Sequence, residues 1–179
     1  MEFIMFYILM VASFIVGIVI LPALQKKPNI ANFLVHGLAV IGSFAAVVCA
    51  IFVFATSAQG FSLPTTVPFL TVSVRVDNLA AFFLAIIGIV GGSASMYAIA
   101  YSKEYFGKRF NTMAGFYLAF LLSMLLVVTV SNIVAFLIVW ELMTVFSFLL
   151  VGHEHEKITS TRASYLYLVM THVGTDRKS

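Results

Sequence analysis

Charged residues and cysteine are both scarce in this chain of 179 residues. Only 9% of the residues are charged and 62% are hydrophobic, whereas soluble domains average about 25% charged residues. This composition excludes an ordinary soluble domain and predicts a membrane protein with several spans. Cys49 is the only cysteine, so an internal disulfide is impossible and a cysteine-based metal site is not expected.

Signatures of catalysis are also missing from the sequence. It contains no glycine-rich phosphate loop and no Ser/His/Asp series, so we expect no catalytic site, no bound cofactor and no metal on this chain. The segment G-H-E-H-E at 152–156 resembles a metal site in composition. It lacks the i, i+4 histidine spacing of a helical zinc motif, and we interpret it as a solvated loop. Any redox or hydrolytic centre would have to lie on a partner protein.

The long apolar runs predict an all-α fold, a polytopic helical membrane protein with five full transmembrane helices and a truncated sixth. Pro64 and Pro68 mark the long loop between the second and third spans. The five full spans are expected at residues 3–24, 31–56, 77–100, 112–130 and 132–151.

Three regions follow from this pattern: residues 1–75 with the first two spans, 76–175 with the remaining spans, and a tail at 176–179. A sixth helix over 163–175 would be about 20 Å long, short of the roughly 30 Å hydrocarbon core. The tail's Asp176, Arg177 and Lys178 would then lie inside the membrane. We therefore expect the tail to be aberrant or truncated.

Lysine and arginine alternate between the loops. The even-numbered loops hold Arg75 alone, and the positive-inside rule therefore places the odd-numbered loops in the cytoplasm and the N-terminus outside. The same placement at segment ends argues against a nucleic-acid surface. We expect a multi-pass protein of the cell (inner) membrane. The basic residues of the odd loops are Lys26, Lys27, Lys103, Lys108, Arg109, Lys157 and Arg162.

Glu141 is the most informative residue, because it is the only formal charge in the apolar stretch 132–151 and lies near its middle. An ionised group there costs at least about 2.5–3.5 kcal/mol. One interpretation is a neutral carboxyl group that hydrogen-bonds a neighbouring helix. The other is a proton site, since burial disfavours the charged form and hydration restores it. Thr144, one turn on, is expected to share its face and to hold water or the proton.

Two histidines and a glycine pair complete the candidates. His172, on the partial sixth helix, would lie close to mid-depth of the membrane. It either relays protons or makes a hydrogen bond to a neighbouring helix. His36, near the start of the second span, is expected at the membrane interface. Gly88 and Gly92, followed by Ser93 and Ser95, predict a helix-packing face.

Three stretches of the sequence point to a known family. They are V-D-N-L at 76–79 with Y-S-K-E-Y at 101–105, V-W-E-L-M at 139–143, and A-S-Y-L-Y at 163–167 with M-T-H-V-G-T at 170–175. Together they resemble the antiporter-like subunits of respiratory complex I, energy-converting hydrogenases and multisubunit sodium/proton antiporters. The third stretch is most similar to the hydrogenase-4 component B and formate hydrogenlyase branch of that family.

The resemblance implies a larger bundle with two inverted repeats and broken helices. It aligns Glu141 with a fifth-helix glutamate that pairs with a lysine farther along, which has no counterpart in these residues. It also implies a membrane-arm subunit that couples electron transfer elsewhere to proton translocation. Its partners would be other membrane subunits of a hydrogenase or complex I-like assembly, lipid and protons, with no redox cofactor of its own. A non-conducting structural subunit and an unrelated solute transporter remain alternatives.

Overall fold

The computed structural model describes residues 2–24, 27–63, 72–102 and 110–152. Five helices in these residues are long and apolar enough to cross a membrane, which confirms the predicted all-α, multi-pass fold. They are α1 (Glu2–Ile20, extended by the 3-10 turn Leu21–Leu24), α2 (Pro28–Ala55), α3 (Asn78–Tyr101), α4 (Phe110–Val127) and α5 (Ile133–Val151). The predicted sixth helix at 163–175 and the tail at 176–179 lie outside the described residues.

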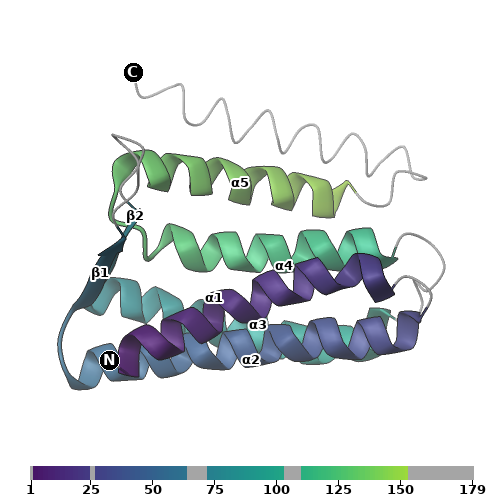
Figure 1. Ribbon diagram of the computed structural model, residues 1–179, viewed down its shortest axis with the longest axis horizontal. Coiled ribbons are helices and arrows are strands. Elements are labelled where there is room, and N and C mark those ends of the chain that lie inside the picture. The colour runs from purple at the N-terminus through teal and green to yellow at the C-terminus, as the bar shows by residue number, and fades with distance from the viewer. Residues whose placement is uncertain (1, 25–26, 64–71, 103–109, 153–179) are drawn as a thin grey trace.

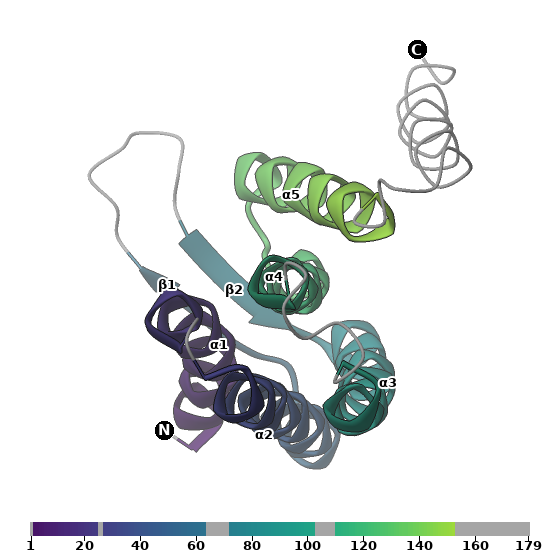
Figure 2. The same cartoon turned by 90° about the vertical axis from the view of Figure 1, so that its right-hand side faces the viewer.

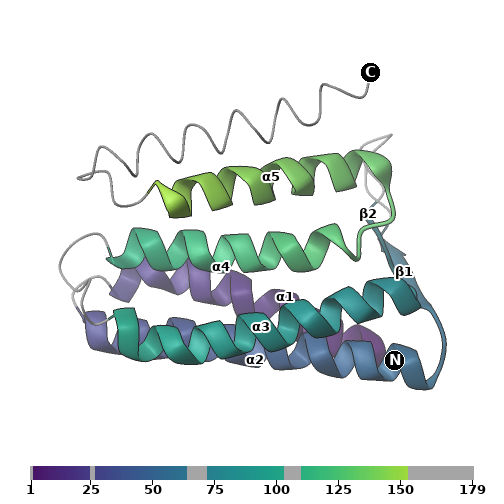
Figure 3. The same cartoon turned by 180° about the vertical axis from the view of Figure 1, so that it is seen from behind.

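Successive helices run in opposite directions in a layered bundle (Figure 1). Helices α1, α2 and α3 form a curved row, α4 lies against this row, and α5 covers the outer side of α4 (Figure 2). Helix α3 follows α2 along its length (Figure 3). The buried core is therefore shared by α1 to α4, and α5 is the most exposed of the five helices.

Local sequence signals explain where the helices begin. Helix α3 starts after Asp77, whose side chain accepts a hydrogen bond from Ala80 N at 2.9 Å, as an N-cap residue does. Helix α2 starts at Pro28, three residues before the predicted start. Proline is favoured in the first helical turn because the backbone donor that it lacks would be unpaired there anyway.

A two-stranded antiparallel hairpin, not foreseen from the sequence, joins α2 to α3. Strand β1 (Gln59–Leu63) pairs with β2 (Val72–Val76), with Phe61 opposite Val74. Strand β2 also pairs with the turn between α4 and α5, since Arg75 N donates to Thr129 O at 2.8 Å and Ser131 N donates to Ser73 O at 2.9 Å. Helix α4 therefore ends at Val127 instead of the predicted Val130.

The two ends of the bundle differ. We call the end with β1 and β2, where α3 and α5 begin, the hairpin end. The opposite end, where α2 and α4 begin and α3 and α5 finish, is called the basic end, because Lys27 lies there and most other basic residues adjoin it in the sequence.

Small residues let α2 and α3 approach closely, as predicted for the glycine pair. A Cβ atom on Gly88 would lie 2.7 Å from the carbonyl oxygen of Ser43, and one on Gly92 would lie 3.4 Å from Ser43 Cβ. Ser95 is buried in the same interface region. Ser93, however, is exposed and donates to Ile89 O, so this serine is not part of the packing face.

Candidate functional site

Glu141 is placed at the middle of α5 by the way that helix begins. Asn132 is its N-cap, and the side-chain oxygen accepts from Val134 N at 2.9 Å and from Ala135 N at 3.2 Å. Glu141 follows eight residues after Ile133 and precedes Val151 by ten. Since the helix is about 28 Å long, the carboxyl group lies close to half-depth, as the sequence predicts.

The carboxyl group stands on the apolar outer surface of the described bundle. Glu141 is exposed, and so are its neighbours Trp140, Leu142 and Val145, each about 40% exposed or slightly more. Within the described residues α5 packs mainly against α4, so most of its surface faces away from the bundle. An ionised carboxylate at mid-depth in such apolar surroundings is costly.

Thr144 and Ser147 form a short row of hydroxyl groups beside Glu141. They follow it at steps of three residues along α5, and both are buried. The Thr144 hydroxyl donates to Trp140 O at 3.1 Å, and the Ser147 hydroxyl donates to Thr144 O at 3.1 Å. Thr144 thus lies one turn from Glu141 as expected, but it is buried while Glu141 is exposed. Sequence reasoning overlooked Ser147, although its spacing from Thr144 was a usable signal.

His172 lies outside the described residues, as does 153–156 of the G-H-E-H-E segment. Across the described part of the chain, no group of three or more His, Cys, Asp or Glu side chains could hold a metal ion.

A second polar cluster, overlooked from the sequence, surrounds His36. This residue was expected at the membrane interface, but it is only 2% exposed and is packed inside the bundle. Its Nε2 lies 3.4 Å from the Ser102 hydroxyl oxygen, and its ring centroid lies 5.6 Å from that of Tyr117. The Tyr117 hydroxyl in turn lies 2.8 Å from the Ser95 hydroxyl. Helices α2, α3 and α4 together build this cluster.

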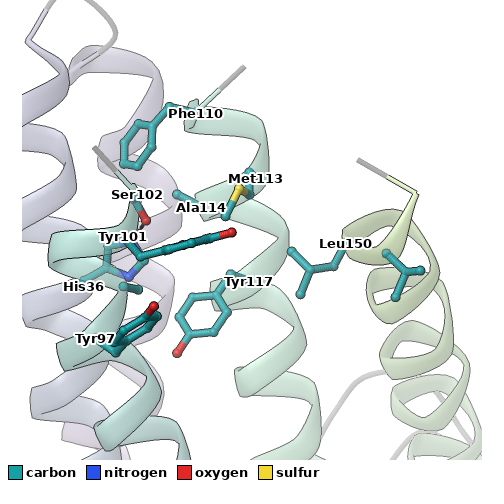
Figure 4. Close-up of a pocket in the computed structure, with 11 residues that line it drawn as sticks. His36, Tyr97, Tyr101, Ser102, Phe110, Met113, Ala114, Tyr117 and Leu150 are labelled. Carbon is teal, nitrogen blue, oxygen red and sulfur yellow. Dashed lines mark hydrogen bonds between the residues drawn. The ribbon is translucent and has the colours of Figure 1, made fainter. Parts of the chain in front are cut away.

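The cluster borders a cavity of about 340 Å³ at the basic end (Figure 4). The Tyr97, Tyr101 and Tyr117 rings reach toward it from α3 and α4, and Leu150 closes it from α5. The cavity is lined by His36, Tyr97, Ala98, Tyr101, Ser102, Phe110, Met113, Ala114, Tyr117, Leu150 and Val151.

Comparison with known proteins identifies homologues among membrane subunits, while no family model matches the chain. Hydrogenase-4 component B of Escherichia coli is 32% identical over 107 residues, which are 60% of this chain and 16% of that protein. NADH-quinone oxidoreductase subunit L of Mycobacterium tuberculosis is 32% identical over 101 residues, 56% of this chain and 16% of that protein.

A third homologue is the protein named "Putative antiporter subunit mnhA2" of Staphylococcus saprophyticus. It is 32% identical over 107 residues, covering 55% of this chain and 13% of that protein. The chain therefore spans only about an eighth to a sixth of the length of these relatives. The resemblance drawn from the three sequence stretches is confirmed by these matches.

Proposed function

We propose that this chain, a homologue of the antiporter-like membrane subunits, contributes to proton translocation and that Glu141 holds the transported proton. Electron transfer would take place in partner subunits, as the resemblance to membrane-arm subunits implies. The names of the relatives support a hydrogenase or an NADH–quinone type of complex as the coupled assembly.

The position of Glu141 carries this proposal. The sequence has ten basic and seven acidic residues, yet Glu141 alone lies within the described spans beyond a first helical turn. Glu2 lies at the first residue of α1, and Asp77 caps α3. Since a charge at mid-depth costs at least about 2.5–3.5 kcal/mol, a carboxyl group there is usually functional.

The surroundings suit a group that binds and releases a proton. A carboxyl group can carry a proton in its neutral form and release it as a carboxylate to water or to a partner group. The buried hydroxyls of Thr144 and Ser147 offer hydrogen-bond positions between Glu141 and the basic end, where Leu150 and Val151 border the cavity. His172, from the sequence alone, remains a proposed further relay.

The outer face of α5 supports the proposed partners. Ile138, Trp140, Leu142 and Val145 leave an apolar surface on this helix that suits either lipid or another membrane subunit. We further propose, from the distribution of basic residues, that the protein lies in the cell (inner) membrane with its N-terminus outside.

The test is the Glu141→Gln substitution in the complete assembly, measured as proton pumping by inverted vesicles. Glutamine keeps the volume and the hydrogen-bonding capacity of the side chain but cannot titrate. We expect assembly to stay intact and proton pumping to fall by about tenfold or more, whereas Glu141→Asp keeps part of the activity.

Glu2→Gln is the matched control, because it makes the same chemical change at the start of α1 instead of in mid-span. It should pump at the normal rate. Normal pumping by Glu141→Gln would instead favour the alternative of a non-conducting structural subunit, with Glu141 as a packing residue.

A further inference from the structure

Two buried polar atoms on α2, one of them on a residue that lines the cavity, have no hydrogen-bond partner among the described residues. His36 is almost fully buried, and its Nδ1 has no hydrogen-bond partner among the described residues. Asn32, one turn nearer the basic end, donates to Ile99 O at 2.7 Å, while its Oδ1 is likewise without a partner in the described part of the chain. A buried polar atom left in this state costs about 1–3 kcal/mol. Of the two residues, His36 lines the cavity and Asn32 does not, so the His36 position favours a small polar ligand in the cavity.

The cavity has the size and the groups to hold such a ligand. A volume of about 340 Å³ accommodates roughly ten water molecules at about 30 Å³ each. Water needs two to four polar partners, and His36, Ser102, Tyr101 and Tyr117 all line the cavity. Tyr117 continues this polar wall inward, because its hydroxyl contacts Ser95 Oγ at 2.8 Å and donates to Gly91 O at 3.3 Å.

The described residues around the cavity carry no charged side chain. Among the described residues, those that line the cavity include no Asp, Glu, Lys or Arg, and the titratable side chains beside His36 are the phenols Tyr97, Tyr101 and Tyr117. The other charged side chains of the described helices and their caps lie farther along the chain. Lys27 lies nine residues before His36, at the start of α2, and Glu141 lies nine residues before Leu150 on α5. Asp77 and Glu2 lie at the hairpin end. Among the described residues that line the cavity, His36 therefore carries the one imidazole.

We propose that the cavity is filled with water from the basic end and that His36 is a second proton-binding group, distinct from Glu141. The neutral imidazole accepts a proton at Nδ1 from a hydronium ion in the cavity and forms an imidazolium. The imidazolium then returns the proton from Nδ1 to another water molecule in the cavity, which restores the neutral imidazole. This role rests on the proposed proton function, whereas the hydration of the cavity does not.

Hydration is tested by cysteine accessibility in a Cys49→Ser background, which removes the only native thiol. Ala98 lines the cavity, whereas Met96, two residues away on α3, is 65% exposed on the outer surface and does not line it. A charged, water-soluble thiosulfonate reacts with the thiolate, which forms only in water. We expect Ala98→Cys to react at least about tenfold faster than Met96→Cys. Equal rates, or faster reaction of Met96→Cys, would overturn the hydrated cavity.

The role of His36 is tested by proton pumping in the complete assembly. His36→Gln retains hydrogen-bonding groups but does not titrate near neutral pH, so we expect pumping to slow by about tenfold with labelling of Ala98→Cys unchanged. Normal pumping by an assembled His36→Gln complex would refute the role of His36 and leave that of Glu141 standing.

A second variant leaves His36 intact and fills the cavity. Ala98→Phe should slow pumping to a similar extent and should also slow the labelling of Met113→Cys, which lies on the opposite, α4 side of the cavity. Slower labelling together with normal pumping would contradict the idea that protons pass through the cavity. If Glu141→Gln loses proton pumping while His36→Gln and Ala98→Phe keep it, the proposed role of Glu141 stands and that of His36 and the cavity is refuted.

Discussion

The contact between Gly88 and α2 allows a stability prediction with an internal reference. A Cβ atom at Gly88 would lie 2.7 Å from the carbonyl oxygen of Ser43 and 2.8 Å from Val47 Cγ2. The carbonyl belongs to the backbone of α2, so it cannot turn away as a flexible side chain could. Gly88→Ala must therefore push α2 and α3 apart along their closest contact.

The magnitude follows from two opposing effects. Adding a methyl group to a well-packed interface costs about 1–3 kcal/mol. Replacing glycine by alanine inside a helix gains up to about 1 kcal/mol in intrinsic propensity. Gly37 on α2 isolates the second effect, because a Cβ atom there would meet nothing within 4 Å. The propensity gain is the same in both variants, so Gly88→Ala should be less stable than Gly37→Ala by about 1–3 kcal/mol.

The assay is unfolding of each purified variant by increasing SDS in mixed micelles, followed by helical circular dichroism. Gly37→Ala should unfold at or above the SDS fraction of the unmodified protein, and Gly88→Ala below it. Equal stability of the two alanine variants would show that α2 and α3 do not approach at Gly88 as the structure describes, and would refute the reasoning.

Two further predictions concern α3 and the orientation in the membrane. Asp77→Ala removes the N-cap bond to Ala80 N and should lower the free energy of unfolding by about 0.5–2 kcal/mol, whereas Asp77→Asn should retain most of it in the same assay. Lys108→Cys in a Cys49→Ser background should be modified by an impermeant thiol reagent in inverted vesicles and not in intact cells. Labelling from outside intact cells would contradict the proposed topology.

Composition and hydropathy were sufficient to predict the five spans. In lipid a spanning segment must hydrogen-bond its own backbone polar groups, so a long apolar run can cross the membrane only as a helix. The hairpin was missed even though V-S-V-R-V at 72–76 alternates apolar and polar residues. A strand this short gains its stability from partners distant in sequence. Ser131 supplies such contacts, since its hydroxyl donates to Ser73 O at 3.1 Å and to Ser73 Oγ at 2.8 Å.

The candidate site was predictable to the extent that it depends on a single helix. The mid-span position of Glu141 and its spacing to Thr144 follow from helix geometry alone. The burial of His36 could not be deduced, because it depends on how α2, α3 and α4 pack together. A signal was nevertheless present: Asn32 and His36 are four residues apart, which places both polar side chains on one face of an otherwise apolar helix.

The difference between the two ends of the bundle gives the proposed proton path a direction. At the hairpin end, polar side chains bond to one another: the Tyr7 hydroxyl contacts Thr129 Oγ1 at 2.9 Å, and Ser131 bonds to Ser73. At the basic end, Asn32 and His36 hold the buried side-chain polar atoms that have no partner within the described residues. Water gains hydrogen bonds by entering at the basic end and displaces existing ones at the hairpin end. Because Glu141 lies between these ends, we expect its proton to exchange first with the cavity side.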